Sequence, residues 1–373
     1  MKEKFSLKDH LFNKVTVTYL ADLLAAVDSN FNKKKFVSEV MAEFPELELK
    51  ARIGWITEVL AKQLPADPGV ALKLIVAALP PPLDPTKTDD DFGRFIFASL
   101  GEYVVLHGCN KKYLKQSFTT LKHITMRFSM EDAMRAFLNN FPKETLAEYD
   151  KWVSDKNYHV RRLVSESTRP SLPWSRKISV DYKVPVKYLD VLHADKTRYV
   201  TRSVANHLND ISKKDGELVV ATLKRWHKEK TQNPLELDWL TRHALRTLVK
   251  QGHADALALL GYTAHTIPKV SNLVVPKKVM KGERLSFSFD VTSSIAQNLL
   301  IDYVIDFVKI SGATKPKVFK IKKMAALPDA VVSVQKNHYL KADATTFKLN
   351  AGTHSLTIQI NGQKLATAQF EVV

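Results

Sequence analysis

The residues of this sequence that could do chemistry are carboxylates and tryptophans that lie within a strongly basic region. The carboxylates are Glu131, Glu166 and Asp210, and the aromatic residues are Trp152 and Trp174. Carboxylates weaken simple phosphate binding, so their presence among many lysines and arginines needs another reason. A carboxylate can act as a general base, or it can stabilise a positive charge that develops on a substrate. Aromatic faces attract the same kind of charge.

Each of these residues also has an ordinary structural interpretation. Glu131 can form an i,i+4 pair with Arg135, and Glu166 can pair in the same way with Arg162. Such a pair on an exposed surface contributes under about 1 kcal/mol. Either tryptophan can belong to a hydrophobic core. The residues alone leave both interpretations open.

Most familiar enzyme motifs are missing from the sequence. It contains no phosphate-binding G-x-x-x-x-G-K-[ST], no dinucleotide glycine fingerprint, no H-E-x-x-H and no nucleophile elbow. The 12 histidines lack metal-ligand spacing, and the single cysteine, Cys109, excludes an intrachain disulfide framework and a cysteine-rich zinc module. Nucleotide hydrolysis, zinc chemistry and thiol chemistry are therefore disfavoured.

The elements that must position the candidate residues are helices, from residue 7 to about residue 262. Apolar residues recur at spacings of three and four in KVTVTYLADLLAAV (14–27), LKARIGWITEVLAKQL (49–64) and FGRFIFASLGEYVVLHG (92–108). The proline-rich segment LPPPLDPTKTDDD (79–91) predicts a long loop between helical pairs.

Part of this region is a repeat. Aligning VRRLVSE, VTRSVAN and LTRHALR superposes, at steps of 40 residues, Arg162, Arg202 and Arg242. Helix pairs of this period are HEAT-like and stack into a curved solenoid, so equivalent arginines lie along one face, where they can meet phosphates. The residues four positions further on share that face and are Glu166, Asn206 and Arg246. Each arginine could instead bind the next repeat.

The C-terminal region has a different pattern. RLSFSFDVTS (284–293), LLIDYVIDFVKI (299–310), TTFKLNAGTHSLTIQING (345–362) and KLATAQFEVV (364–373) alternate apolar and polar residues, and NAGTHS and INGQK resemble hairpin turns. We expect an immunoglobulin-like β-sandwich after a mostly helical domain. The predicted domains are residues 1–265 and 266–373.

The composition limits the partners and the compartment. The chain of 373 residues has 56 Lys and Arg against 39 Asp and Glu, a net charge of +17, which favours a polyanion such as nucleic acid or an anionic membrane. The N-terminus has no apolar signal region, and the longest apolar run is too short to span a membrane. We expect a cytoplasmic protein that does not associate with membranes.

Several segments resemble the AlkC and AlkD type DNA alkylation repair glycosylases, and the AlkC branch in particular. They are FGRFIFASLGEYVVLHG, TMRFSMEDAMRAFL, KWVSDKNYHVRRLVSESTRPSLPW, YVTRSVANHLNDISKKDGE and LDWLTRHALRTLVKQGHADALALLGY, in order over residues 1–265. The expected sandwich resembles the immunoglobulin-like module found on part of the AlkC branch. Asn206 stands where the AlkD branch carries a tryptophan, which also favours AlkC.

The resemblance implies a monomeric, metal-independent and cofactor-free DNA glycosylase of the nucleoid. A basic groove of the solenoid would hold alkylated double-stranded DNA, and the N-glycosidic bond of cationic bases such as 3-methyladenine would be hydrolysed without a base-flipping pocket. A carboxylate near the sugar would stabilise the oxocarbenium-like transition state and position a water, as in glycoside hydrolysis.

The resemblance also assigns roles to residues in the matching motifs. The expected catalytic carboxylates are Glu131, Glu166 and Asp210, with Glu102 as a weaker fourth. The expected lesion-facing aromatic residues are Trp152 and Trp174. The expected DNA-binding residues are Arg161, Arg162, Arg169, Arg202, Asn206, Arg242 and Arg246.

Two other function classes stay open at this point. Repeat solenoids are mostly binding scaffolds, so a non-catalytic adaptor for protein or nucleic acid is the main alternative. An RNA-binding repeat protein would use regular stacking aromatic residues, which this sequence lacks. The lysines of the sandwich could contact DNA or simply form a solvated basic surface; they are Lys277, Lys278, Lys281, Lys309, Lys315, Lys317, Lys320, Lys322 and Lys323.

Overall fold

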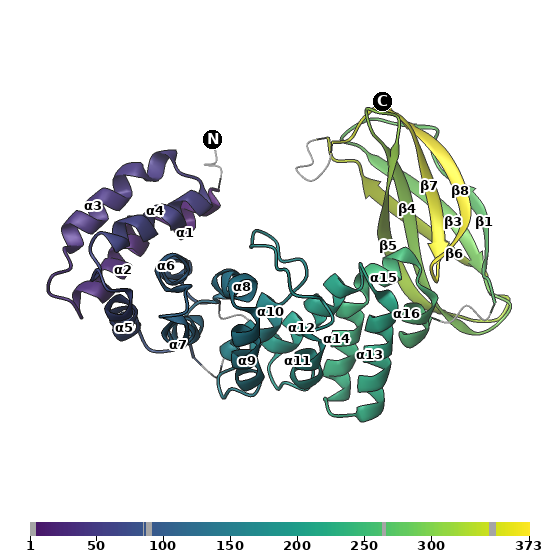
Figure 1. The fold of residues 1–373 in the computed structure, drawn as a ribbon. Coiled ribbons are helices and arrows are strands. Elements are labelled where there is room, and N and C mark those ends of the chain that lie inside the picture. Colours follow the sequence, from purple (N-terminus) through teal and green to yellow (C-terminus); the bar gives the residue numbers. More distant parts are fainter. Residues whose placement is uncertain (1–4, 85, 87–91, 263–265, 343–347) are drawn as a thin grey trace. The chain divides into compact units, whose positions relative to one another are not determined.

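The computed structural model describes residues 5–84, 86, 92–262, 266–342 and 348–373, in two compact units (Figure 1). The first unit is helical and comprises the chain up to Lys214 together with Trp226–Ala244. The second comprises Asp215–Arg225 and Leu245–Val373. The mostly helical region followed by a β-sandwich agrees with the fold expected from the sequence.

Six helices of the first unit form a continuous row in which each helix packs on the next. They are α4 (Leu49–Ala61), α6 (Ala98–Gly108), α8 (Glu131–Asn140), α10 (Tyr158–Ser167), α12 (Arg198–Ile211) and α14 (Pro234–Ala244). This packing order is that of a solenoid of helical repeats. It brings side chains that are far apart in the sequence next to one another.

The remaining helices flank this row or connect its members. They are α1 (Leu7–Leu11), α2 (Lys14–Ala25), α3 (Lys33–Glu43), α5 (Pro68–Ala78), α7 (Leu114–Thr125), α9 (Pro142–Trp152) and α11 (Val186–Leu192), with short 3₁₀ turns at Phe44–Glu46 and Phe95–Phe97. Helix α13 (Gly216–Glu229) contributes residues to both units. The expected helix over 92–108 thus begins as a 3₁₀ turn, and of the expected loop 79–91, residues 85 and 87–91 lie outside the described residues.

The second unit contains α15 (Arg246–Gln251), α16 (Ala254–Leu259) and two β-sheets. One sheet has the order β1-β3-β6, from Lys269–Val274, Arg284–Thr292 and Val332–Tyr339. The other has the order β2-β8-β7-β4-β5, from Lys278–Val279, Gln363–Val372, Gly352–Ile360, Gln297–Val308 and Thr314–Ala326. Aromatic and aliphatic side chains from both sheets form one core, as in a sandwich.

One of the two expected hairpin turns is present. Asn361 and Gly362 connect β7 and β8 with positive φ angles of 48° and 82°, as a two-residue hairpin turn requires. The expected turn at NAGTHS is wrong, because β7 follows it but β6, the preceding strand, belongs to the other sheet. Gly352–Ser355 of that segment already belong to β7.

The compact units divide differently from the boundary expected near residue 265. The last helix ends at Leu259 and the first strand begins at Lys269, so helices do give way to strands at that place. However, α15 and α16 group with the sandwich. The turn after α15 approaches the β7–β8 turn so closely that a Cβ added to Gly362 would lie 2.5 Å from the Cα of Gly252.

Candidate active site

Five charged side chains form a continuous chain of ion pairs across α8, α10, the start of the loop after α10, and α12. Arg162 lies 3.9 Å from Glu131 and 3.5 Å from Glu166. Arg169 lies 2.6 Å from the other oxygen of Glu166 and 2.8 Å from Asp210. The three carboxylates expected to be catalytic are therefore brought together, with two guanidinium groups between them.

Glu166 is the centre of this chain and is only 5% exposed. Besides its two arginines, it accepts a hydrogen bond of 2.6 Å from the hydroxyl of Ser203. Burial alone would raise the pKa of Glu166, but Arg162, Arg169 and Ser203 outweigh it, so the pKa is lowered. Glu166 is a carboxylate whose hydrogen-bonding capacity is already used inside the protein.

Arg162 is held mainly by protein groups, and its side chain is 12% exposed. Its guanidinium donates to the Ser129 hydroxyl at 2.8 Å and lies 4.4 Å from the centre of the Tyr199 ring. Burial opposes its charge, whereas Glu166, Tyr199 and Glu131 favour it, and the net effect raises the pKa. The expectation that Arg162 clamps a phosphate is corrected, since its guanidinium faces carboxylates within the protein.

Glu131 is the end of the chain that remains available. It occupies the first turn of α8, where the helix dipole favours a negative charge. Its Oε2 atom has no hydrogen-bond partner among the described residues, and its side chain lines a cavity of about 270 Å³. Of the three expected catalytic carboxylates, Glu131 is the one that lines this cavity.

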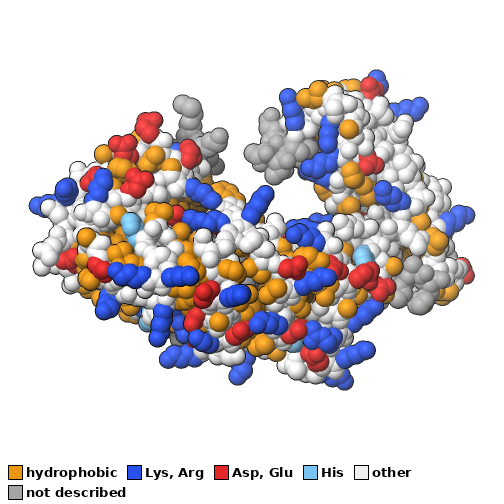
Figure 2. Space-filling model, in the orientation of Figure 1, with side chains coloured by type: hydrophobic (Ala, Val, Ile, Leu, Met, Phe, Trp, Pro, Cys, Tyr) orange, Lys and Arg blue, Asp and Glu red, His pale blue; other side chains and the backbone are white. Residues whose placement is uncertain are grey.

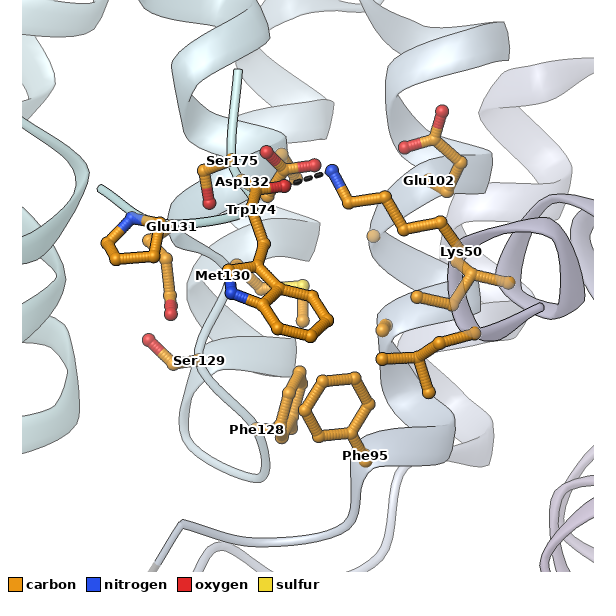
Figure 3. Close-up of a pocket in the computed structure, with 16 residues that line it drawn as sticks. Lys50, Phe95, Glu102, Phe128, Ser129, Met130, Glu131, Asp132, Trp174 and Ser175 are labelled. Carbon is orange, nitrogen blue, oxygen red and sulfur yellow. Dashed lines mark hydrogen bonds between the residues drawn. The ribbon is translucent and has the colours of Figure 1, made fainter. Parts of the chain in front are cut away.

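The cavity has mostly apolar walls and an aromatic side chain at its mouth (Figure 3). Figure 3 shows Trp174 above Phe95 and Phe128, with Glu131 and Ser129 on one side and Lys50 on the other. The groups that line the cavity come from α4, the 3₁₀ turn before α6, α6, the segment that begins α8, and the loop between α10 and α11. The complete lining is Leu49, Lys50, Ile53, Phe95, Ala98, Gly101, Glu102, Phe128, Ser129, Met130, Glu131, Asp132, Ala133, Pro173, Trp174 and Ser175.

Trp174 is 68% exposed and has a φ angle of 69°. A bulky residue in this left-handed region is strained by about 1–3 kcal/mol, and such strain persists only where surrounding contacts fix the backbone. The Trp174 carbonyl accepts a hydrogen bond from Lys50 of α4. The expectation that Trp174 faces a ligand site is compatible with its exposure and its place in the cavity.

The loop that carries Trp174 is fastened to α6 and α8 by two arginines. Arg176 makes two hydrogen bonds of 2.8 and 2.7 Å to Glu102 and also pairs with Asp132. Arg135, which is buried, donates to the carbonyl groups of Ser167, Arg169 and Arg176. No interaction between Arg135 and Glu131 is among these contacts, and Glu102 is engaged by Arg176.

The expectation that Trp152 faces a lesion is wrong. Trp152 is 3% exposed and packs at the end of α9 against Phe118 and Tyr149, with ring centres 6.4 and 5.8 Å away. Tyr149 and Trp152 are three residues apart in α9, which places them on one buried face of the helix. Trp152 is therefore a core residue.

The expected DNA-binding arginines divide into two groups. Arg161 is engaged by Asp195, at 2.5 and 3.1 Å, and Arg169 is engaged by Glu166 and Asp210, so both have structural contacts in place of an open surface. Arg202 on α12 is partly exposed, and Arg242 on α14 is exposed and lies 3.9 Å from Asp238. Asn206 accepts a hydrogen bond of 2.9 Å from His243, and Arg246 begins α15 in the second unit.

Some residues of the site were not found from the sequence. Ser129, Tyr199, Lys50 and Arg176 hold the carboxylates or the loop, but their partners lie tens of residues away. Arg135 was expected only as a partner of Glu131, and its contacts with the loop were not expected. Arg176 follows Trp174 by two residues in RPSLPWSR, and a second cation beside an exposed aromatic residue is the one available signal.

The visible face of the molecule carries many basic side chains but is not uniformly basic. Figure 2 shows Lys and Arg side chains spread over the visible face of both units, with Asp and Glu between them.

Among the described residues, no cluster of three or more His, Cys, Asp or Glu could hold a metal ion. Within the same residues, no helix is both long and apolar enough to cross a membrane.

Comparison with known proteins identifies the relatives of this chain. Residues 269–373 match the family described as "Uncharacterised protein YhaZ, C-terminal Ig-like domain". The chain is 34% identical to the uncharacterized protein YhaZ of Bacillus subtilis (strain 168) over 367 residues, 97% of this chain and 98% of that protein. A solved structure, the Pseudomonas fluorescens alkylpurine DNA glycosylase AlkC bound to DNA containing an abasic site analog, matches with a TM-score of 0.86 and 34% identity, covering 99% of this chain and 100% of AlkC. The resemblance to the AlkC branch is thus confirmed, and the chain belongs to the family that contains AlkC and YhaZ.

Proposed function

We propose that the chain is a monofunctional DNA glycosylase that hydrolyses the N-glycosidic bond of cationic alkylated bases in duplex DNA, with 3-methyladenine as the first substrate. The observation that carries this proposal is the Glu131 side chain, which lines a cavity beside the exposed Trp174 and whose buried Oε2 atom accepts no hydrogen bond from the described residues. A full-length match to an alkylpurine DNA glycosylase that is bound to DNA supports it.

The reaction needs little from the protein besides a negative charge and a positioned water. An alkylated base carries positive charge, so it leaves with the electron pair of the bond to the sugar and becomes neutral. The sugar then holds the positive charge, and water adds to it and loses a proton. A carboxylate such as Glu131 stabilises that cation and can accept the proton.

Of the three carboxylates in the chain of ion pairs, Glu131 has the weakest contact with a cation. Glu166 lies between Arg162 and Arg169, and Asp210 pairs with Arg169 and also with Lys213, at 2.9 Å. Glu131 has only the longer contact of 3.9 Å with Arg162 among these ion pairs. In this proposal Glu131 faces the lesion sugar, while Glu166 and Asp210 act behind it by holding the two arginines in place.

Trp174 supplies the aromatic face on the other side of the cavity. An aromatic ring stacked on a base contributes about 1–3 kcal/mol, and the interaction is stronger when the partner is a cation. Its exposure leaves the indole free to meet DNA at the cavity mouth. In agreement with the family resemblance, we propose that the lesion is engaged without rotation into a base-flipping pocket.

Phosphate contacts would come from residues that stay accessible. Arg202 and Arg242 lie on successive helices of the row, and the sandwich carries a lysine-rich strand, β5. Lysines on an edge strand also prevent sheet-to-sheet aggregation, so charge alone does not assign them to DNA. If they bind phosphates, removal of each lysine should make the slope of log binding constant against log salt concentration shallower by about 0.9.

The test is release of free 3-methyladenine from methylated duplex DNA by the purified chain, with EDTA present and a uracil-containing duplex as control. Glu131→Gln should lower the release rate by about 10²–10³-fold, because a charge stabiliser of the transition state is lost. DNA affinity should stay the same or rise, because one negative charge is removed.

A non-catalytic adaptor predicts a different pattern. It would bind the duplex tightly, and neither the chain nor Glu131→Gln would release base. That result would refute the glycosylase proposal. A monomer in solution, which we also propose, is checked in the same preparation by light scattering.

A further inference from the structure

We propose that Arg176 is a positioning residue for Trp174, holding the loop between α10 and α11 in the one conformation that presents the indole at the cavity. The inference rests on the proposed function, because the role of Trp174 at the cavity belongs to it. Arg176 itself lies two residues after Trp174 and does not line the cavity.

The position of Trp174 comes from its backbone and not from burial of its ring. With 68% of the residue exposed, packing of the indole fixes it only in part. Its φ angle of 69° lies in a region that a tryptophan adopts only under constraint. Contacts on the chain before and after Trp174 therefore supply that constraint, together with the hydrogen bond from Lys50 to the Trp174 carbonyl.

Arg176 supplies it on the C-terminal side by joining the loop to two helices at once. Its guanidinium binds both oxygens of Glu102 on α6, and it also pairs with Asp132 in the first turn of α8. The backbone N–H of Arg176 donates to the Asp132 carboxylate at 2.8 Å. A planar fork matched to two carboxylates fixes direction as well as distance.

Neighbouring contacts complete the fastening of the loop. Arg135 donates to the Arg169 carbonyl, before Trp174, and to the Arg176 carbonyl, after it. Asn139 donates to the Lys177 carbonyl at 2.8 Å. Trp174 thus lies between two anchored points, and of these anchors Arg176 is the one that reaches a second helix of the row, α6.

The first experiment compares Arg176→Met with a matched control, Arg198→Met. Arg176 and Glu102 have side-chain exposures of 33% and 23%, and Arg198 and Glu236 have 34% and 19%. In both pairs the arginine donates to both oxygens of the glutamate, and both pairs lie within the first unit, but the hydrogen-bond partners of Arg198 among the described residues do not include the loop. The control therefore measures what loss of such a pair does to stability alone.

We expect Arg176→Met to slow single-turnover release of 3-methyladenine by about 10- to 100-fold, as for a misplaced catalytic contact. Arg198→Met should stay within about twofold of the unaltered chain. DNA affinity should change little in Arg176→Met, because its guanidinium is engaged by carboxylates. Equal rates for the two variants would overturn the inference.

A double variant separates positioning from a general structural role. If Arg176 acts through Trp174, then Arg176→Met combined with Trp174→Ala should be no slower than Trp174→Ala alone. Multiplied effects would mean that Arg176 acts independently, and the inference would fail. If Arg176→Met does not fold, Glu102→Gln removes one arm of the anchor and leaves Asp132. Because Glu102 also lines the cavity, this variant is judged by the hydrogen exchange of residues 169–179, which should become faster, and unchanged exchange would overturn the inference.

A readout that does not depend on activity keeps this inference distinct from the proposed function. Hydrogen exchange of the segment 169–179 should become faster in Arg176→Met and stay unchanged in Arg198→Met. An active parent chain with unchanged exchange in Arg176→Met refutes the positioning role alone. A parent chain without activity refutes the glycosylase, while faster exchange would still support the anchor.

Discussion

Replacing Glu166 by Gln removes the central charge of the ion-pair chain while keeping the size of the side chain. The amide retains one acceptor oxygen, but its NH₂ group then faces a guanidinium or the Ser203 hydroxyl. Of their carboxylate partners, Arg162 then keeps only Glu131, at 3.9 Å, and Arg169 keeps only Asp210. Breaking a buried pair from one side costs about 3–5 kcal/mol. For a unit of this size that lowers Tm by about 6–20 °C.

The dependence on pH has a defined sign. Burial raises the pKa of Glu166, but the arginines and Ser203 lower it by more than burial raises it. The net shift of the pKa is therefore downward from 4.5. A lowered folded-state pKa means that the charge stabilises the fold above the unfolded-state pKa and that this stabilisation is lost as pH falls through the folded value. The stability gap between the parent chain and Glu166→Gln should thus be full at neutral pH and should narrow below about pH 4.5.

Urea unfolding followed by the circular dichroism of the helices measures this gap. The matched control is Glu236→Gln, which breaks a more exposed pair with Arg198 in the same unit and should cost less. A Glu166→Gln variant within about 1 kcal/mol of the parent chain at neutral pH would refute the reasoning, since breaking a buried pair costs more than that. A gap that does not narrow on acidification would refute the assigned charge state.

Three further outcomes follow from other parts of the structure. Trp152→Ala should cost about 3–5 kcal/mol in urea unfolding, as loss of a core aromatic does, while base release per folded molecule stays unchanged. Burial raises the pKa of Asp302 to about 6, although nearby lysines lower it, so ionisation of Asp302 destabilises the fold as pH rises. Asp302→Asn should therefore stabilise the sandwich above about pH 6 and change its stability little near pH 4. Calorimetry at the two pH values measures this difference. Gly362→Ala should lower Tm, because a Cβ there would meet Gly252 at 2.5 Å and φ is 82°.

The order of helices and strands follows closely from local patterns in the sequence. Helical spacing predicts α2 and α4 to within a few residues, and alternation predicts β3 and β8. β5 was not predicted. It is an edge strand that pairs with β4 only, and its many lysines obscure the alternation of apolar and polar residues. The turn expected at NAGTHS was wrong for a different reason. Turn residues indicate that the chain changes direction, but they do not indicate which strands pair with each other.

The candidate site was predictable in its residue types and not in its connections. Glu131 and Glu166 stand out as acids in a basic region. They differ because Arg169 and Ser203 contact Glu166 and do not contact Glu131, and these contacts cannot be seen in the sequence. Trp152 and Trp174 look alike as isolated tryptophans. Spacing could have separated them, because Trp152 shares an apolar helical face and the other lies among prolines and serines.

The backbone contact between Gly252 and Gly362 has a consequence for dissecting the chain. A fragment that begins where helices give way to strands would keep the β7–β8 turn but lose the surface on which it rests, including Leu257, whose Cδ1 would lie 2.8 Å from a Cβ at Gly362. The smallest fragment that keeps this joint intact begins no later than Leu245, where the second unit resumes. Boundaries drawn from family descriptions of the strands alone would cut through a folded body.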